Sequence, residues 1–112
     1  MTPEEFVKGF YLEKKSLMND AFNKDSKSSV STLITELNLD SANNEKIKRI
    51  ISTLLTDAFY TILLGLDGAA SIGDEQHMYK ILDENDNEIS GGEIESYAYD
   101  YFHGNQFDLE NE

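Results

Sequence analysis

The chain has 112 residues, of which 22 are Asp or Glu and nine are Lys or Arg, so its formal net charge at neutral pH is −13. A chain of this length favours a single domain, and the lack of cysteine excludes disulfides and thiolate chemistry. The surplus negative charge repels phosphate and anionic lipid, which argues against nucleic acid and membranes as partners.

Capping residues and apolar spacing predict two helices in the first third of the chain. Thr2, Pro3 and Glu5 form the start signal of the first helix: a hydroxyl at the N-cap, proline in the first turn and a capping-box glutamate. Its apolar stripe reaches about residue 23 and consists of Phe6, Phe10, Tyr11, Leu17, Met18, Ala21 and Phe22. A polar loop over 23–29 precedes a short second helix over 30–37.

The most regular pattern predicts a long third helix from about residue 42 to 64, which Gly65 ends. Its apolar residues follow steps of three and one without a miss: Ile47, Ile50, Ile51, Leu54, Leu55, Ala58, Phe59, Ile62 and Leu63. The opposite face carries Thr53, Thr56 and Tyr60 rather than charges. This pattern predicts a central helix that is contacted on more than one side.

After Gly65 the pattern changes to short strands and a closing helix. We expect one short strand around 69–72 and a β-hairpin over 77–90, with the turn at 83–87. A second capping box at 90–93 then begins a helix that His103 and Gly104 end, with Ile94, Tyr97, Ala98, Tyr101 and Phe102 facing inward. The fold class predicted is α+β: one domain over 1–104 with three N-terminal helices, a hairpin or small three-stranded antiparallel sheet, and a C-terminal helix. Residues 105–112 are expected to be a flexible acidic tail, with Phe107 and Leu109 as candidates for docking.

The excess charge lies entirely in the second half of the chain. Residues 1–56 carry eight acidic and eight basic residues, whereas residues 57–112 carry fourteen acidic residues and a single base, Lys80. Carboxylates that crowd within a Debye length of about 8 Å repel one another and reduce stability. Two explanations compete: net charge for solubility, and electrostatic steering toward a basic partner.

Metal binding and catalysis find little support. Asp83, Asp86 and Glu88 resemble the start of a calcium loop, but no register supplies both the turn glycine and the final glutamate. The chain has two histidines, one arginine, no cysteine and no nucleophile-elbow motif. We therefore expect no enzyme, no cofactor and no metal.

A protein-binding face is the best-supported functional site. An outward tyrosine framed by carboxylates supplies contact area at low entropic cost, and the acidic turn supplies steering. The predicted partner-binding residues are Asp83, Glu84, Asp86, Glu88, Glu95, Tyr99 and Asp100.

The second half of the chain, through its segments at 60–68, 79–83 and 101–104, resembles small acidic bacterial immunity proteins of polymorphic and contact-dependent toxin systems. The resemblance implies a non-catalytic protein that neutralises a cognate toxin domain by stoichiometric binding, and it assigns no binding residue. A cytoplasmic location is expected, because Met1 is followed by acidic residues rather than a signal peptide and no run of about 18 apolar residues occurs. A homo-oligomer is allowed but not indicated. The alternatives are a nucleic-acid mimic or regulator that blocks another enzyme and, third, a metal-binding or hydrolytic domain.

Overall fold

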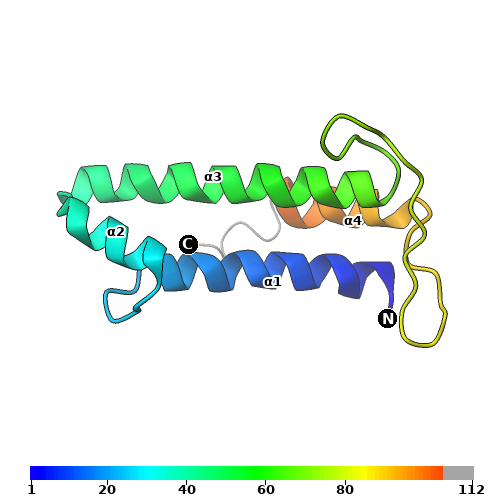
Figure 1. The fold of residues 1–112 in the computed structure, drawn as a ribbon, viewed down its shortest axis with the longest axis horizontal. Helices are drawn as coiled ribbons and strands as arrows, with labels where there is room; N and C mark the ends of the chain where they lie inside the picture. Colours follow the sequence, from blue (N-terminus) through cyan, green and yellow to red (C-terminus); the bar gives the residue numbers. More distant parts are fainter. Residues whose placement is uncertain (105–112) are drawn as a thin grey trace.

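A computed structural model describes residues 1–104 and consists of four helices (Figure 1). They are α1 (Pro3–Ala21), α2 (Ser29–Leu37), α3 (Ser41–Leu66) and α4 (Glu93–Phe102). The molecule is elongated, with extents of 47 × 29 × 27 Å and a radius of gyration of 16.2 Å. A compact domain of this length has a radius of gyration near ~13 Å, so the helices leave much of their surface uncovered.

The α+β fold class is wrong, because the described part of the chain is all-α. The expected hairpin over 77–90 and the expected strand around 69–72 are replaced by an irregular connection with two isolated bridges, Ile72 with Glu75 and Leu82 with Glu88. Strand pairing needs several cross-strand contacts and one buried face, whereas every residue from 71 to 80 is exposed. The alternating pattern therefore has no surface to pack against.

Local side-chain caps set the first three helix starts, whereas Gly65, which was predicted to end the long helix, lies within α3. Thr2 Oγ1 accepts a hydrogen bond from Glu5 N at 3.1 Å and Glu5 Oε1 accepts one from Thr2 N at 2.9 Å, which confirms the first capping box. Helix α2 ends at Asn38 in the left-handed conformation, with φ 49°. Asp40 then caps α3 by accepting from Asn43 N at 2.8 Å.

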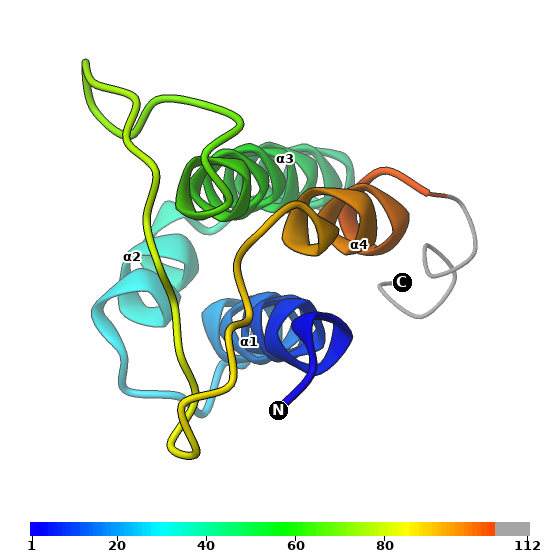
Figure 2. The same cartoon turned by 90° about the vertical axis from the view of Figure 1, so that its right-hand side faces the viewer.

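The core lies at one end, where α1, the last turns of α3 and α4 meet (Figure 2). Tyr11 packs its ring 5.5 Å from that of Tyr101 and 6.0 Å from that of Phe102. The fully or nearly buried members are Val7, Tyr11, Leu63, Ile89, Ile94, Ala98, Tyr101 and Phe102.

Most of the apolar stripe of α3 faces away from this core. Only Leu63 of the stripe is fully buried, and Phe59 is packed against the core, while Ile50 and Leu54 expose 55% and 65% of their surface. Both α1 and α4 contact α3, yet they leave much of its apolar stripe exposed. Helix α3 is also long and apolar enough to cross a membrane by length and composition, with 11% of its apolar window buried. The cytoplasmic location accordingly stays a prediction.

Candidate functional site: the acidic end

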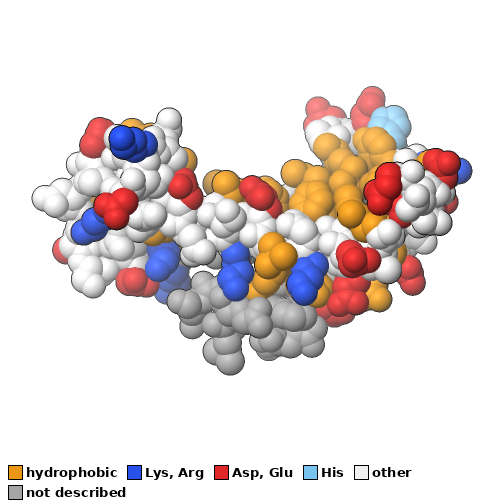
Figure 3. All heavy atoms as spheres, turned by 90° about the horizontal axis from the view of Figure 1, so that it is seen from below, with side chains coloured by type: hydrophobic (Ala, Val, Ile, Leu, Met, Phe, Trp, Pro, Cys, Tyr) orange, Lys and Arg blue, Asp and Glu red, His pale blue; other side chains and the backbone are white. Residues whose placement is uncertain are grey.

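Four chain segments meet at one end of the long axis: the start of α1, the end of α3, the connection 67–92 and the start of α4 (Figure 1). Residues 1–7 and 64–95 together carry eleven carboxylate side chains and one lysine. At the opposite end, residues 22–48 carry four carboxylates and four lysines. Figure 3 shows acidic side chains over the end that carries the start of α1. Lys or Arg side chains lie along the middle of the molecule in the same view. The charge imbalance of the sequence is thus also an imbalance in space.

An apolar groove of about 380 Å³ lies at this end, beside α1. Phe6, Phe10 and Phe59 line it, and Glu5 and Glu13 are also part of its wall. The rings of Phe10 and Phe59 meet edge to face at 5.9 Å. Figure 3 shows apolar side chains gathered on this part of the surface. The sequence showed Phe6 and Phe10 only as members of the apolar stripe of the first helix and did not predict the groove.

The acidic turn, residues 83–88, uses one of its carboxylates to hold itself together. Asp83 accepts hydrogen bonds from the Met1 ammonium at 2.8 Å, Asn85 N at 2.8 Å and Asn87 N at 3.0 Å. The Met1 ammonium, followed by the Asn87 amide, holds the pKa of Asp83 well below its usual range. Asp83 therefore organises the turn rather than offering its charge to a partner.

We expect the Met1–Asp83 contact to give the stability of the fold a pH window. The pKa of Asp83 is lowered and that of the Met1 ammonium is raised, chiefly by their mutual hydrogen bond. The stabilisation is therefore complete between the unfolded-state values, about 3.9 for Asp and about 8 for the amine. It is lost as pH falls through the folded pKa of Asp83 or rises through that of Met1. Melting temperatures of wild type and Asp83→Asn between pH 2 and 10 should diverge most inside this window, and parallel curves would contradict the contact.

The other predicted residues of the acidic turn are available to a partner. Glu84 and Asp86 are exposed, and Asp86 adopts a left-handed conformation with φ 65°. Glu88 is exposed as well, although its Oε2 accepts from Ser90 Oγ at 3.3 Å. The turn thus presents three carboxylates to solvent, whereas the fourth, Asp83, is hydrogen-bonded to Met1, Asn85 and Asn87.

A separate group on α4 brings two predicted residues together with one that was missed. Tyr99 exposes 56% of its surface, and both Tyr99 and Glu95 lie close enough to Tyr60 of α3 to help raise its pKa, after burial as the largest cause. The ring of His103 stands edge to face with that of Tyr60 at 4.4 Å between centroids. The sequence pattern placed Tyr60 on the uncharged face of the third helix but did not predict it as a site residue.

The start of α4 also corrects the predicted capping box at 90–93. The N-cap is Gly92, which has no side chain to offer, and the Ser90 hydroxyl instead bonds within the connection, accepting from Ile81 N at 3.0 Å. Asp67, which follows α3, takes over the role. Its carboxylate accepts from Gly91 N at 2.9 Å, Gly92 N at 2.8 Å and Glu95 N at 3.0 Å. A residue 25 positions upstream of Gly92 thus caps the helix and joins α3 to α4.

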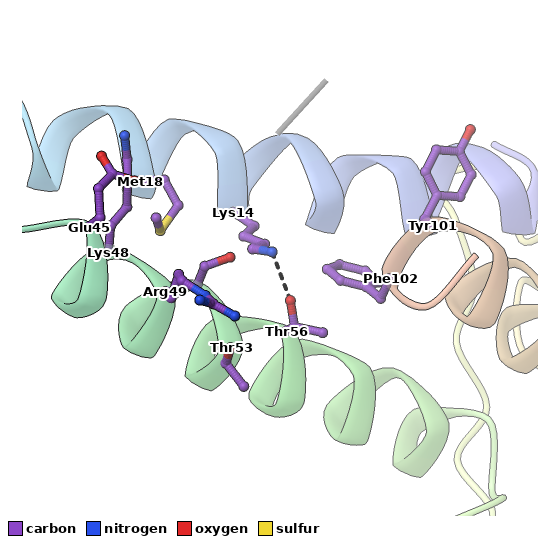
Figure 4. Close-up of a pocket in the computed structure, with 10 residues that line it drawn as sticks. Lys14, Met18, Glu45, Lys48, Arg49, Thr53, Thr56, Tyr101 and Phe102 are labelled. Atoms are coloured by element: carbon purple, nitrogen blue, oxygen red, sulfur yellow. Dashed lines mark hydrogen bonds between the residues drawn. The ribbon is translucent and has the colours of Figure 1, made fainter. Parts of the chain in front are cut away.

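A second, basic site was missed in the sequence. A cleft of about 720 Å³ opens between α1 and α3 beyond the end of α4 (Figure 4). Lys14, Lys48 and Arg49 line it together with one acid, Glu45. The sequence contained one sign of this cleft, namely the uncharged face of the third helix. Thr53 and Thr56 of that face both line the cleft.

The predicted site residues therefore fall into two groups rather than one face. One group is the acidic turn, and the other is Glu95 with Tyr99 on α4. Asp100, also on α4, is half-buried. Within residues 1–104, no three His, Cys, Asp or Glu side chains come together as a possible metal site. Comparisons of the chain with protein-family models, curated proteins and solved structures found no significant match.

Proposed function

We propose that this chain is a non-catalytic binding domain that receives a basic protein at its acidic end, with a cognate bacterial toxin as the partner class to test first. The observation that carries the proposal is the coincidence of unbalanced carboxylates and an apolar groove at the same end. Interfaces combine an apolar centre with a polar rim. Phe6, Phe10 and Phe59 supply the apolar centre, and Glu5 and Glu13 lie in the same wall. Met1, which also lines the groove, binds Asp83 of the acidic turn.

Charge supports a protein partner with a basic surface. Eleven carboxylates against one lysine at this end generate a potential that accelerates the approach of a positive surface and repels an acidic one. The more specific role, neutralising a toxin, is supported by the resemblance of the sequence to immunity proteins. A nucleic-acid mimic would use the same acidic end, so the two roles differ in their partners rather than in the surface.

We expect the double substitution Glu84→Gln and Asp86→Asn to slow association with the partner and to flatten the salt dependence of the association rate. Both side chains are exposed, and asparagine tolerates the left-handed backbone of position 86. The partner is sought by co-purification with the product of the neighbouring gene, and rates are measured by stopped flow at several salt concentrations.

The matched control is Asp25→Asn with Glu36→Gln, which removes the same charge at the opposite end and should leave the association rate nearly unchanged. Equal slowing by both pairs would contradict a local steering surface and leave only net charge. Displacement of DNA from several unrelated proteins, without binding to the neighbouring product, would support mimicry instead.

A further inference from the structure

We propose that the apolar groove at the acidic end binds an α-helix of the partner protein, and that this helix places an apolar side chain at Gly9 between two basic ones. The inference rests on the proposed function, because it names the part of the basic partner that the groove receives. Gly9 of α1 carries it, since this residue lines the groove and nothing in the fold of residues 1–104 requires a glycine there. The acidic tail expected at 105–112 lies outside the described residues and plays no part.

The usual structural reasons for a glycine are absent at position 9. The residue lies inside α1, where glycine is unfavourable because its backbone loses the most freedom on folding. Gly9 is exposed and is not among the glycines with positive φ. A Cβ built on it meets no atom of residues 1–104 within 4 Å, whereas a Cβ on Gly65 overlaps the side chain of Ile72. Gly9 therefore weakens α1 without making room for another part of the described chain.

Gly9 makes a notch in one row of side chains along α1. Residues 1, 5, 9 and 13 follow one another at steps of four, which places them in a single row on the helix surface, and all four line the groove. The row therefore carries the carboxylates of Glu5 and Glu13 on either side of a position that has no side chain. A hydrogen bond from Thr2 lowers the pKa of Glu5, so this carboxylate stays ionised at neutral pH.

A helix suits this notch better than an extended segment does. The main-chain groups of α1 are bonded within the helix, so the wall offers no backbone donors or acceptors to an added strand, whereas a helix satisfies its own. Helices pack when side-chain rows of one enter the spaces of the other, and a missing side chain lets a backbone approach closely. The rings of Phe6 and Phe10, 5.3 Å apart, lie in the same wall and supply apolar contacts.

The two carboxylates define where the basic side chains of the partner helix lie. Glu5 and Glu13 are eight residues apart, which is about 12 Å along α1. Helices that cross at about 20° run almost along each other. A partner helix with a basic residue four positions before and four positions after its apolar anchor then repeats the spacing of the row.

Filling the notch first tests whether the free chain needs the glycine. Gly9→Ala and Gly9→Gln are expected to raise the melting temperature by about 2–6 °C, because both residues favour a helix and a Cβ has space at this position. A lower melting temperature would overturn the proposal, since the glycine would then serve the fold itself.

Binding is tested with a synthetic alanine- and glutamine-based peptide of about 18 residues, long enough to form a helix. It carries one leucine with a lysine four residues to either side. Titrated into the isotope-enriched full chain, it should shift the backbone amide signals of Gly9 and Phe10 and leave those of α2 in place. Gly9→Gln should weaken its binding by about tenfold or more, because the new side chain fills the notch.

Two controls separate the notch from general attraction to an acidic protein. Ser16→Gln makes a similar change at an exposed position of α1 outside the groove and should leave the peptide affinity unchanged. A peptide of the same composition, with its lysines two residues from the leucine and so on the opposite helix face, should bind more weakly. Equal binding of both peptides, or equal effects of Gly9→Gln and Ser16→Gln, would overturn the proposal.

The product of the neighbouring gene distinguishes this inference from the proposed function. Weaker binding to Gly9→Gln than to wild type supports the helix-binding groove. Equal binding to both would overturn the groove assignment and leave the binding function standing. Binding to neither would contradict the proposed function, and the peptide titration would still decide whether the groove receives a basic helix.

Discussion

Replacing Asp67 with alanine is expected to lower the free energy of unfolding by about 2–3 kcal/mol, because one buried carboxylate caps α4 through three backbone amides. Gly91 and Gly92 are exposed, so their N–H groups regain water and the loss stays below the sum of three charged hydrogen bonds. Asp67→Asn retains an acceptor oxygen and should cost about half as much. Urea unfolding measures the differences.

Asp74→Ala is the control for this prediction, since it removes an exposed carboxylate from the same connection. It should change the free energy of unfolding by no more than about 0.5 kcal/mol. A similarly small effect of Asp67→Ala would show that α4 starts without the help of Asp67. The link between α3 and α4 would then rest on side-chain packing alone.

Leu63→Ala is expected to cost about 2–5 kcal/mol, the usual range for a leucine truncated in a packed core. Leu63 exposes none of its surface and belongs to the cluster shared with Ile94 and Ala98. Leu54, nine residues earlier in the same helix and in the same apolar stripe, exposes 65% of its surface. Its truncation should cost at most about 0.5 kcal/mol.

Comparing the losses in unfolding free energy for the two leucines shows which side of α3 is buried. Equal losses would mean that the outward face, with Ile50 and Leu54, is covered in solution. Repeating the unfolding at two protein concentrations separates the causes, because cover by a second copy makes stability concentration-dependent. We expect Leu63→Ala to have the same effect at both concentrations.

Helix positions were predictable from the sequence because their signals are local. Thr2 and Glu5 lie three residues apart and cap α1 within one turn, and the apolar spacing of α3 requires only a helical period. The hairpin was wrong for the opposite reason. Alternation around Met78 to Leu82 has meaning only if one face is buried, and Met78 exposes 82% of its surface.

The candidate site was predictable in composition but not in layout. The acidity of 57–112 was evident, and Glu84, Asp86 and Tyr99 are exposed. The features that the sequence did not predict depend on residues far apart in the chain. The Met1 ammonium donates a hydrogen bond to Asp83, and Tyr60 of α3 lies close to Glu95 and Tyr99 of α4. The basic cleft combines Lys14 with Lys48 and Arg49, whose proximity depends on how α1 crosses α3.

The sequence by itself determined where the helices run and which half holds the negative charge, since both follow from neighbouring residues. Only the tertiary structure decided which side of α3 is buried, because its stripe is wide enough to offer several faces and packing uses just the last turns, around Leu63. It also decided that Asp67 rather than Ser90 caps α4, as a buried carboxylate satisfies amides wherever the fold brings them within hydrogen-bonding distance.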